Sequence, residues 1–166
     1  MHDYFIAVDF DGTCVRHEFP EIGSDIGAVP ALKALVKDGW KLILHTMRAH
    51  PSSKQNDPSL KTMGLTPTSR DTLSEAEEWF RRNGIPLYAS NDNPSQHSWT
   101  ESKKVYAHIY IDDAALGVPL VDPNDGGRPY VDWKGVMLML VERGLVSKET
   151  YSEYVMSIID EDGNML

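Results

Sequence analysis

The chain has little of what would mark a secreted or membrane protein. Cys14 is its single cysteine among 166 residues, which excludes an intrachain disulfide framework. No apolar run approaches the roughly 20 residues that a membrane-spanning helix requires. The first ten residues show neither the basic segment nor the small-residue cleavage site of a signal peptide. These absences predict a cytoplasmic protein that does not enter a membrane.

The sequence also lacks an excess of positive charge. Its formal net charge is −9 at pH 7, which opposes nonspecific binding to nucleic acid, because that binding depends on Lys and Arg neutralising phosphates. A local basic groove is still compatible with this charge. Hydrophobic residues make up 41% and charged residues 25% of the chain, as in ordinary globular domains. Since no linker or internal repeat divides it, we expect one domain over residues 1–166.

The most informative stretch is residues 4–13, where an apolar run is followed by two carboxylates. Residues 5–8 have the character of a buried strand in a parallel sheet. Asp9 and Asp11 follow it, and Gly12 permits a sharp turn. Ligands of open α/β sheets bind beyond the carboxyl ends of the strands, and alternate residues of a strand point the same way. The two acids therefore either face one site or form a solvated turn at the strand end.

Strand and helix patterns alternate along the rest of the chain. Further strands are expected at 41–46, 85–89 and 105–111, and helices at 29–39, 72–84, 133–143 and 148–159. Thr72 and Glu75 have capping-box spacing, and Ser147 is the expected cap of the last helix. Strand, helix and strand in this order build a parallel sheet with right-handed crossovers. The pattern predicts an α/β fold that ends in helices over about 132–160.

Two irregular segments follow the first two predicted strands. Residues 13–23 are interpreted as a short hairpin or flap, in which Arg16 and His17 either reach a ligand or form an ordinary exposed surface. Residues 49–69 are polar and interrupted by prolines. Long loops of this kind are usually functional lids or disordered segments, so a lid over the site and a flexible surface insertion both remain open.

Three predicted strands end in polar residues at one sheet edge. These residues are Asp9 and Asp11, Thr46, and Asp112 with Asp113, and a lysine pair precedes the last strand. Oxygen ligands without a Cys/His cluster suit Mg²⁺ rather than zinc. A carboxylate can form an aspartyl-phosphate, and a second acid can protonate the leaving oxygen and then activate water.

This ordered set resembles the four motifs of the haloacid dehalogenase (HAD) superfamily, in its phosphatase branch. The matching residues are Asp9-Phe10-Asp11-Gly12-Thr13, Thr46, Lys104 and Ile111-Asp112-Asp113, and the resemblance spans roughly residues 4–116. The stretch from Asp9 to Gly23, with Arg16-His17 and Phe19-Pro20, and the later Tyr110–Asp113 are similar to small capless hydrolases of bacteria and phages. The resemblance implies a HAD-like, Rossmann-like three-layer α/β/α sandwich with a mainly parallel sheet and a minimal cap or none.

The resemblance also implies catalytic roles. Asp9 would be the nucleophile and a metal ligand, and Asp11 the general acid/base with its backbone carbonyl on the metal. Thr46 would bind the phosphoryl group. Lys104 would steady Asp9 and the phosphoryl oxygens, with Lys103 as the competing choice.

The remaining site residues follow from the same resemblance. Asp112 would complete the Mg²⁺ site, and Asp113 would contact the ion directly or support it from behind. The substrate-binding candidates are Phe10, Gly12, Met47 and Arg48. Arg48 either binds the substrate phosphate or pairs with a carboxylate.

The expected function is that of a Mg²⁺-dependent phosphomonoester hydrolase acting on a small phosphorylated substrate. An acid two residues after the nucleophile suits hydrolysis of a phosphoenzyme, and the dehalogenases of the superfamily lack it. Neither interval between the motifs has room for a full cap domain. Capless members have open sites that accept large substrates or are shielded by oligomerisation, so a homo-oligomer stays open. The alternatives are a nucleotide or polynucleotide-end phosphatase, which the negative charge disfavours for long polymers, and a non-catalytic phosphate-binding or regulatory protein.

Overall fold

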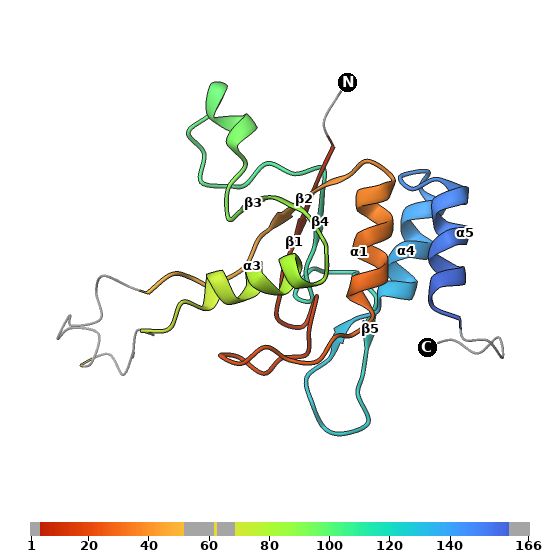
Figure 1. Ribbon diagram of the computed structural model, residues 1–166, viewed down its shortest axis with the longest axis horizontal. Helices are drawn as coiled ribbons and strands as arrows, with labels where there is room; N and C mark the ends of the chain where they lie inside the picture. The colour runs from red at the N-terminus through yellow and green to blue at the C-terminus, as the bar shows by residue number, and fades with distance from the viewer. Residues whose placement is uncertain (1–3, 52–61, 63–68, 160–166) are drawn as a thin grey trace.

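A four-stranded parallel sheet forms the centre of the protein (Figure 1). The computed structural model describes residues 4–51, 62 and 69–159. The strands are β1 (Phe5–Val8), β2 (Lys41–Leu44), β3 (Leu87–Ser90) and β4 (Ile109–Ile111), in the spatial order β3-β2-β1-β4. The helices are α1 (Ala28–Lys37), α3 (Thr72–Arg82), α4 (Trp133–Glu142) and α5 (Lys148–Ser157). The predicted α/β fold with a Rossmann-like sandwich architecture is confirmed.

Long helices cover one face of the sheet. Ile6 and Val8 of β1 and Leu44 of β2 are fully buried in a core that also contains side chains of α1, α3 and α4. Figure 1 shows α1, α4 and α5 side by side at one flank of the sheet. Each fully buried side chain of this size contributes about 1.5–3 kcal/mol. This core therefore holds the ends of β1 and β2 in fixed positions.

The opposite face of the sheet has a thinner cover. Alternate strand residues point to opposite faces, and on this face Phe5 and Ile43 pack with Val105, Tyr88 and Ala107. Within residues 91–108, all of which are described, the only helical element is the 3₁₀-helix η1 (Pro94–Ser98). The cover on this face thus comes from the extended chain at Val105 and Ala107.

The fourth strand is shorter than the predicted 105–111. Only the residues of β4 pair with β1. Ahead of it, the backbone N–H of Tyr106 donates to Gln96 Oε1 at 2.7 Å, and the carbonyl of Tyr106 accepts from Asn93 Nδ2 at 2.8 Å. Gln96 and Asn93 are buried, so their side-chain amides take the place of a neighbouring strand.

The helix caps agree with the sequence at one helix and differ at another. Ser147 caps α5 as predicted, because its hydroxyl accepts from the backbone N–H of Thr150 at 3.0 Å. The cap of α3 is Asp71 rather than Thr72. The hydroxyl of Thr72 instead donates to the carbonyl of Ala49 at 3.1 Å, so a contact with the chain after β2 displaces the predicted capping box.

A small hairpin forms in a proline- and glycine-rich segment after β4. It consists of β5 (Leu120–Val121) and β6 (Tyr130–Val131), which pair antiparallel. The backbone N–H of Val131 donates to the carbonyl of Gly12 at 2.8 Å. The hairpin therefore supports the turn that follows β1. Across the described part of the chain, no helix is both long and apolar enough to span a membrane.

Candidate functional site

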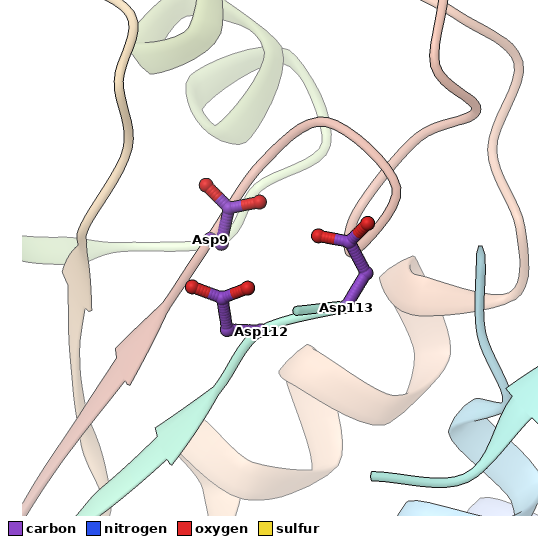
Figure 2. A group of neighbouring side chains, drawn as sticks. All are labelled: Asp9, Asp112 and Asp113. Carbon is purple, nitrogen blue, oxygen red and sulfur yellow. The ribbon is translucent and has the colours of Figure 1, made fainter. Parts of the chain in front are cut away.

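Three aspartates meet at the carboxyl ends of β1 and β4. The backbone N–H of Asp9 donates to the carbonyl of Ile111 at 2.9 Å, which places the two chain ends side by side. Figure 2 shows Asp112 and Asp113, at the end of β4, beside Asp9. One oxygen of each carboxylate lies within 4.8 Å of the others. We call Asp9, Asp112 and Asp113 the aspartate cluster. The sequence resemblance implies Asp9 and Asp112 as metal ligands, and Asp113 as a direct ligand or a support behind them.

Asp9 occupies an unfavourable position for a negative charge. Burial above all, together with the charges of Asp112, Asp113 and Asp11, raises the pKa of its carboxyl to about 7, against a backbone hydrogen bond at Phe10 that lowers it. Among the described residues, no Lys or Arg pairs with Asp9 or Asp112. A divalent cation would relieve this repulsion.

The protein already engages one oxygen of each carboxylate in the aspartate cluster. Asp9 Oδ2 accepts from the hydroxyl of Thr13 at 3.3 Å. Asp112 Oδ1 accepts from the backbone N–H two residues further on at 2.8 Å. Asp113 Oδ2 lies 2.8 Å from Nε2 of His17. The second oxygens of Asp112 and Asp113 have no hydrogen-bond partner in the described part of the chain, so these two residues each offer one uncommitted oxygen.

The turn after β1 is built around Gly12 and Thr13. Gly12 has φ +81°, and a Cβ at this position would lie 2.0 Å from Nε2 of His17. Glycine is therefore required both for the backbone conformation and for the space. The buried hydroxyl of Thr13 also accepts from the backbone N–H of Asp113 at 3.1 Å, and the carbonyl of Thr13 accepts from Trp133 Nε1 at 2.6 Å. Gly12, a predicted substrate-binding residue, thus makes room for His17.

Asp11 is neutralised by Arg48. The guanidinium donates from Nε to Asp11 Oδ2 and from Nη2 to Asp11 Oδ1, each at 2.8 Å. It also donates to the carbonyls of Pro20 and Glu21 at 3.1 and 2.7 Å, and lies 5.0 Å from the ring centre of Phe10. The Arg48 side chain is only 1% exposed. Of the two predicted roles of Arg48, the structure shows the pairing with a carboxylate.

Thr46 is the second residue after β2 and lies in a loop that Asn91 holds. The backbone N–H of Thr46 donates to Asn91 Oδ1 at 2.8 Å, and the hydroxyl of Thr46 accepts from the backbone N–H of Arg48 at 3.2 Å. Asn91 adopts φ 50°, a left-handed conformation that asparagine tolerates better than most residues. Sequence reasoning passed over Asn91, although an asparagine two residues after a predicted strand is a usable signal.

Two of the substrate-binding candidates differ sharply in exposure. The ring of Phe10 is fully buried and packs edge-on against Trp79 with ring centres 5.6 Å apart. Only the backbone of Phe10 could therefore contact a substrate. Met47 is 97% exposed, so its side chain contributes nothing to the fixed part of the site.

Neither predicted lysine forms an ion pair with the described residues of the aspartate cluster. Lys103 and Lys104 are both exposed, and the ammonium group of Lys104 lies 5.5 Å from the ring centre of Tyr110. The choice between them stays a prediction. The proposed lid also stays a prediction, because most of residues 49–69 fall outside the described part of the chain.

A solved structure is similar to this chain over most of its length. It is a conserved protein from Bacteroides thetaiotaomicron, 33% identical, with a TM-score of 0.55, and the match covers 86% of this chain and 93% of that chain. This chain belongs to the family of that protein. No protein-family model and no curated protein matches the sequence. The description of the family member names no activity, so the function rests on the residues of the site.

His45 is a further residue near the site that sequence reasoning missed. It follows β2 directly, and its backbone N–H donates to the carbonyl of Val8 at 2.8 Å, which puts it in the row of Asp9. Its ring meets that of Tyr110 edge-on at 6.2 Å, and its Nδ1 is buried with no hydrogen-bond partner among the described residues. A lone histidine between an apolar run and a threonine carries no pattern that would have identified it.

Proposed function

We propose that this protein is a Mg²⁺-dependent phosphomonoester hydrolase that works through an aspartyl-phosphate on Asp9. The observation that carries the proposal is the aspartate cluster, in which three carboxylates meet at the carboxyl edge of a parallel sheet. Ligand sites of α/β sheets lie at this edge. The HAD-like order of Asp9, Asp11 and Thr46 along the chain supports the same activity.

The residues of the aspartate cluster fit a hard divalent cation. They offer only carboxylate oxygens, and one oxygen each of Asp112 and Asp113 is uncommitted. Mg²⁺ prefers such ligands, supplemented by water and a substrate phosphate oxygen. The burial that raises the pKa of Asp9 makes its charged form costly without a cation. When bound, Mg²⁺ would neutralise charge on the phosphoryl oxygens and orient the phosphate.

The reaction proceeds in two displacements at phosphorus. In the first, a carboxylate oxygen of Asp9 attacks, the bond from phosphorus to the leaving oxygen breaks, and Asp11 gives that oxygen a proton. In the second, Asp11 takes a proton from a water molecule whose oxygen attacks the phosphorus. The bond from phosphorus to Asp9 breaks, which releases inorganic phosphate and restores the carboxylate. The hydroxyl of Thr46 and a lysine hold the phosphoryl oxygens during both steps.

This mechanism requires two side chains to move from the positions described. Asp11 is bound through both oxygens to Arg48, and it must turn away from the guanidinium to exchange a proton with the leaving group. Lys104 must swing from the ring of Tyr110 toward Asp9. Both are rotations of side chains, and lysine keeps its head group mobile on a flexible stem.

The test is hydrolysis of p-nitrophenyl phosphate with Mg²⁺ and with EDTA. We expect turnover only with Mg²⁺, and a loss of at least about a thousandfold in Asp9→Asn, because a nucleophile cannot be replaced. Asp92→Asn is the matched control, since Asp92 is a partly exposed aspartate that pairs with His97. Full turnover by the Asp9→Asn variant would sink the aspartyl-phosphate mechanism.

A substrate panel then separates the alternatives. Sugar phosphates, nucleotides and 3′-phosphorylated oligonucleotides would be compared by kcat/KM. Preference for the oligonucleotides would indicate a polynucleotide-end phosphatase. Calorimetry that shows phosphate binding, with no substrate hydrolysed, would indicate a phosphate-binding protein instead.

A further inference from the structure

We propose that His17 is a positioning residue that leaves Asp113 a single free oxygen, so that the aspartate cluster selects Mg²⁺ over Ca²⁺. The inference rests on the proposed function in taking the cluster as a cation site. It does not require that the protein hydrolyse any substrate.

The contact between His17 and Asp113 is short and largely shielded from water. His17 Nε2 lies 2.8 Å from Asp113 Oδ2, and each side chain is 15% exposed. An ionised carboxylate can only accept hydrogen bonds, so Nε2 must carry the proton and donate it. Charge-assisted hydrogen bonds of this kind are stronger than neutral ones. The contact therefore commits Asp113 Oδ2 and leaves Oδ1 for a cation.

The flap that carries His17 is anchored on both sides of it. The backbone N–H of Arg16 donates to the carbonyl of Ser24 at 2.9 Å. On the other side, Arg48 donates to the carbonyls of Pro20 and Glu21. The imidazole is thus held over Gly12, whose missing side chain provides the space that the ring needs.

The number of oxygens that each carboxylate offers decides which cation fits. Mg²⁺ demands near-octahedral coordination at about 2.0–2.1 Å and retains water, whereas Ca²⁺ takes six to eight oxygens and readily uses both oxygens of one carboxylate. With His17 in place, Asp113 acts as a one-oxygen ligand. Without it, Asp113 is free to present both oxygens. Unlike the backbone N–H that engages Asp112, the His17 side chain can be removed by substitution.

The experiment measures the affinities for MgCl₂ and CaCl₂ by isothermal titration calorimetry in wild type, His17→Leu and His17→Gln. We expect His17→Leu to lose about ten- to a hundredfold in Mg²⁺ affinity, as for other residues that orient a metal ligand. Its Ca²⁺ affinity should fall less or rise, so the Mg²⁺/Ca²⁺ ratio drops at least about tenfold. His17→Gln retains an N–H donor and should recover part of the ratio.

The matched control is His97→Leu. His97 also lies 2.8 Å from a carboxylate, Asp92, but on an exposed loop, so its loss should leave both affinities unchanged. Thermal unfolding would verify that each variant is folded. His17→Asn, which is polar but too short to reach Asp113, replaces His17→Leu if that variant does not fold.

Each result either supports or overturns the role of His17 in selecting Mg²⁺. Equal losses of Mg²⁺ and Ca²⁺ affinity in His17→Leu and His17→Asn would show a merely structural role and overturn the inference. Wild type that binds neither ion would overturn both the inference and the proposed metal site. Selective Mg²⁺ binding that depends on His17, with no hydrolysis of any phosphomonoester, would support the inference and refute only the proposed function.

Discussion

Asp9 and Asp11 are two residues apart, yet they lie in opposite electrostatic surroundings. Asp11 faces a buried guanidinium that binds both of its oxygens. Asp9 faces two further carboxylates, and burial raises its pKa to about 7. Because alternate residues of an extended chain point the same way, the sequence alone suggests that both acids serve one site. The difference arises entirely from residues distant in sequence.

The charge of Asp11 is paired within the protein, whereas the charges of the aspartate cluster are not. On the Arg48 side, the donors of the guanidinium meet carboxylate and carbonyl oxygens, so the charges are compensated within the protein. On the side of the aspartate cluster, three carboxylates lie together, and among the described residues no Lys or Arg pairs with Asp9 or Asp112. Buried charges are normally paired or bound to a metal. The aspartate cluster is therefore the region where we propose that a cation binds, and the Asp11–Arg48 pair belongs to the scaffold that holds the flap against it.

Removal of the Arg48 guanidinium should have the largest effect on the free energy of unfolding. Arg48→Met leaves the Asp11 carboxylate and two flap carbonyls without their donor. Loss of one partner of a buried ion pair costs about 3–5 kcal/mol, so we expect the free energy of unfolding to fall by that amount in urea titrations. Arg82→Met, which removes an exposed helix pair with Glu78, should change stability little. Equal effects of the two substitutions would mean that Arg48 does not hold the flap.

The aspartate cluster should make the free energy of unfolding depend on pH when no metal is present. The folded state raises the pKa of Asp9 from 3.8 to about 7, so it favours the protonated form. The corresponding stability is complete below about pH 4 and is lost as the pH rises through about 7. At about 1.36 kcal/mol per pKa unit, the loss is on the order of 4 kcal/mol. Urea titrations in EDTA should show it in wild type but not in Asp9→Asn.

Added Mg²⁺ provides the second half of this measurement. A cation in the aspartate cluster favours the charged form of Asp9, so the loss between about pH 4 and 7 should disappear at saturating Mg²⁺. A pH dependence that is the same with and without Mg²⁺ would contradict a cation site at Asp9.

Gly12 connects the Asp11–Arg48 pair with the aspartate cluster, because it follows Asp11 in the chain and makes room for His17. In Gly12→Ala, the new methyl group would displace the imidazole of His17, and the residue would keep an unfavourable positive φ. We expect a loss of about 2 kcal/mol in unfolding free energy, together with weaker Mg²⁺ binding. Gly84→Ala has φ +67° but no neighbour within 4 Å. This control should lose only the unfolding free energy that comes from an alanine with positive φ. Unchanged Mg²⁺ affinity in both variants would mean that Gly12 does not support the aspartate cluster.

Much of the aspartate cluster could be predicted because local rules place it. Apolar runs that end in Asp9 and in Asp112 are enough to position these acids at one edge of a parallel sheet. Ser147 could be predicted as a helix cap for the same reason, since its partner Thr150 is three residues away. Rules of this kind need only the neighbouring sequence.

The partners that decide the chemistry could not be predicted, because they come from distant parts of the chain. Asp11 and Arg48 are 37 residues apart, and His17 and Asp113 are 96 apart. Nothing in the local pattern distinguishes Arg48 as a partner of Asp11 from Arg48 as a phosphate ligand. The short β4 has a similar origin, because the side chain of Gln96 takes the backbone N–H of Tyr106. Tertiary contacts therefore overrode strand propensity there.

The smallest expected effect concerns Thr13, which joins the two strand ends of the aspartate cluster. Its hydroxyl donates to Asp9 Oδ2 and accepts from the backbone N–H of Asp113. Thr13→Val keeps the shape but removes both hydrogen bonds, so the free energy of unfolding should fall by about 1 kcal/mol. Thr13→Ser keeps the hydroxyl and is the control for the pair of bonds. If Thr13→Val were as stable as wild type and bound Mg²⁺ equally well, the backbone of β1 and β4 alone would suffice to hold the cluster together.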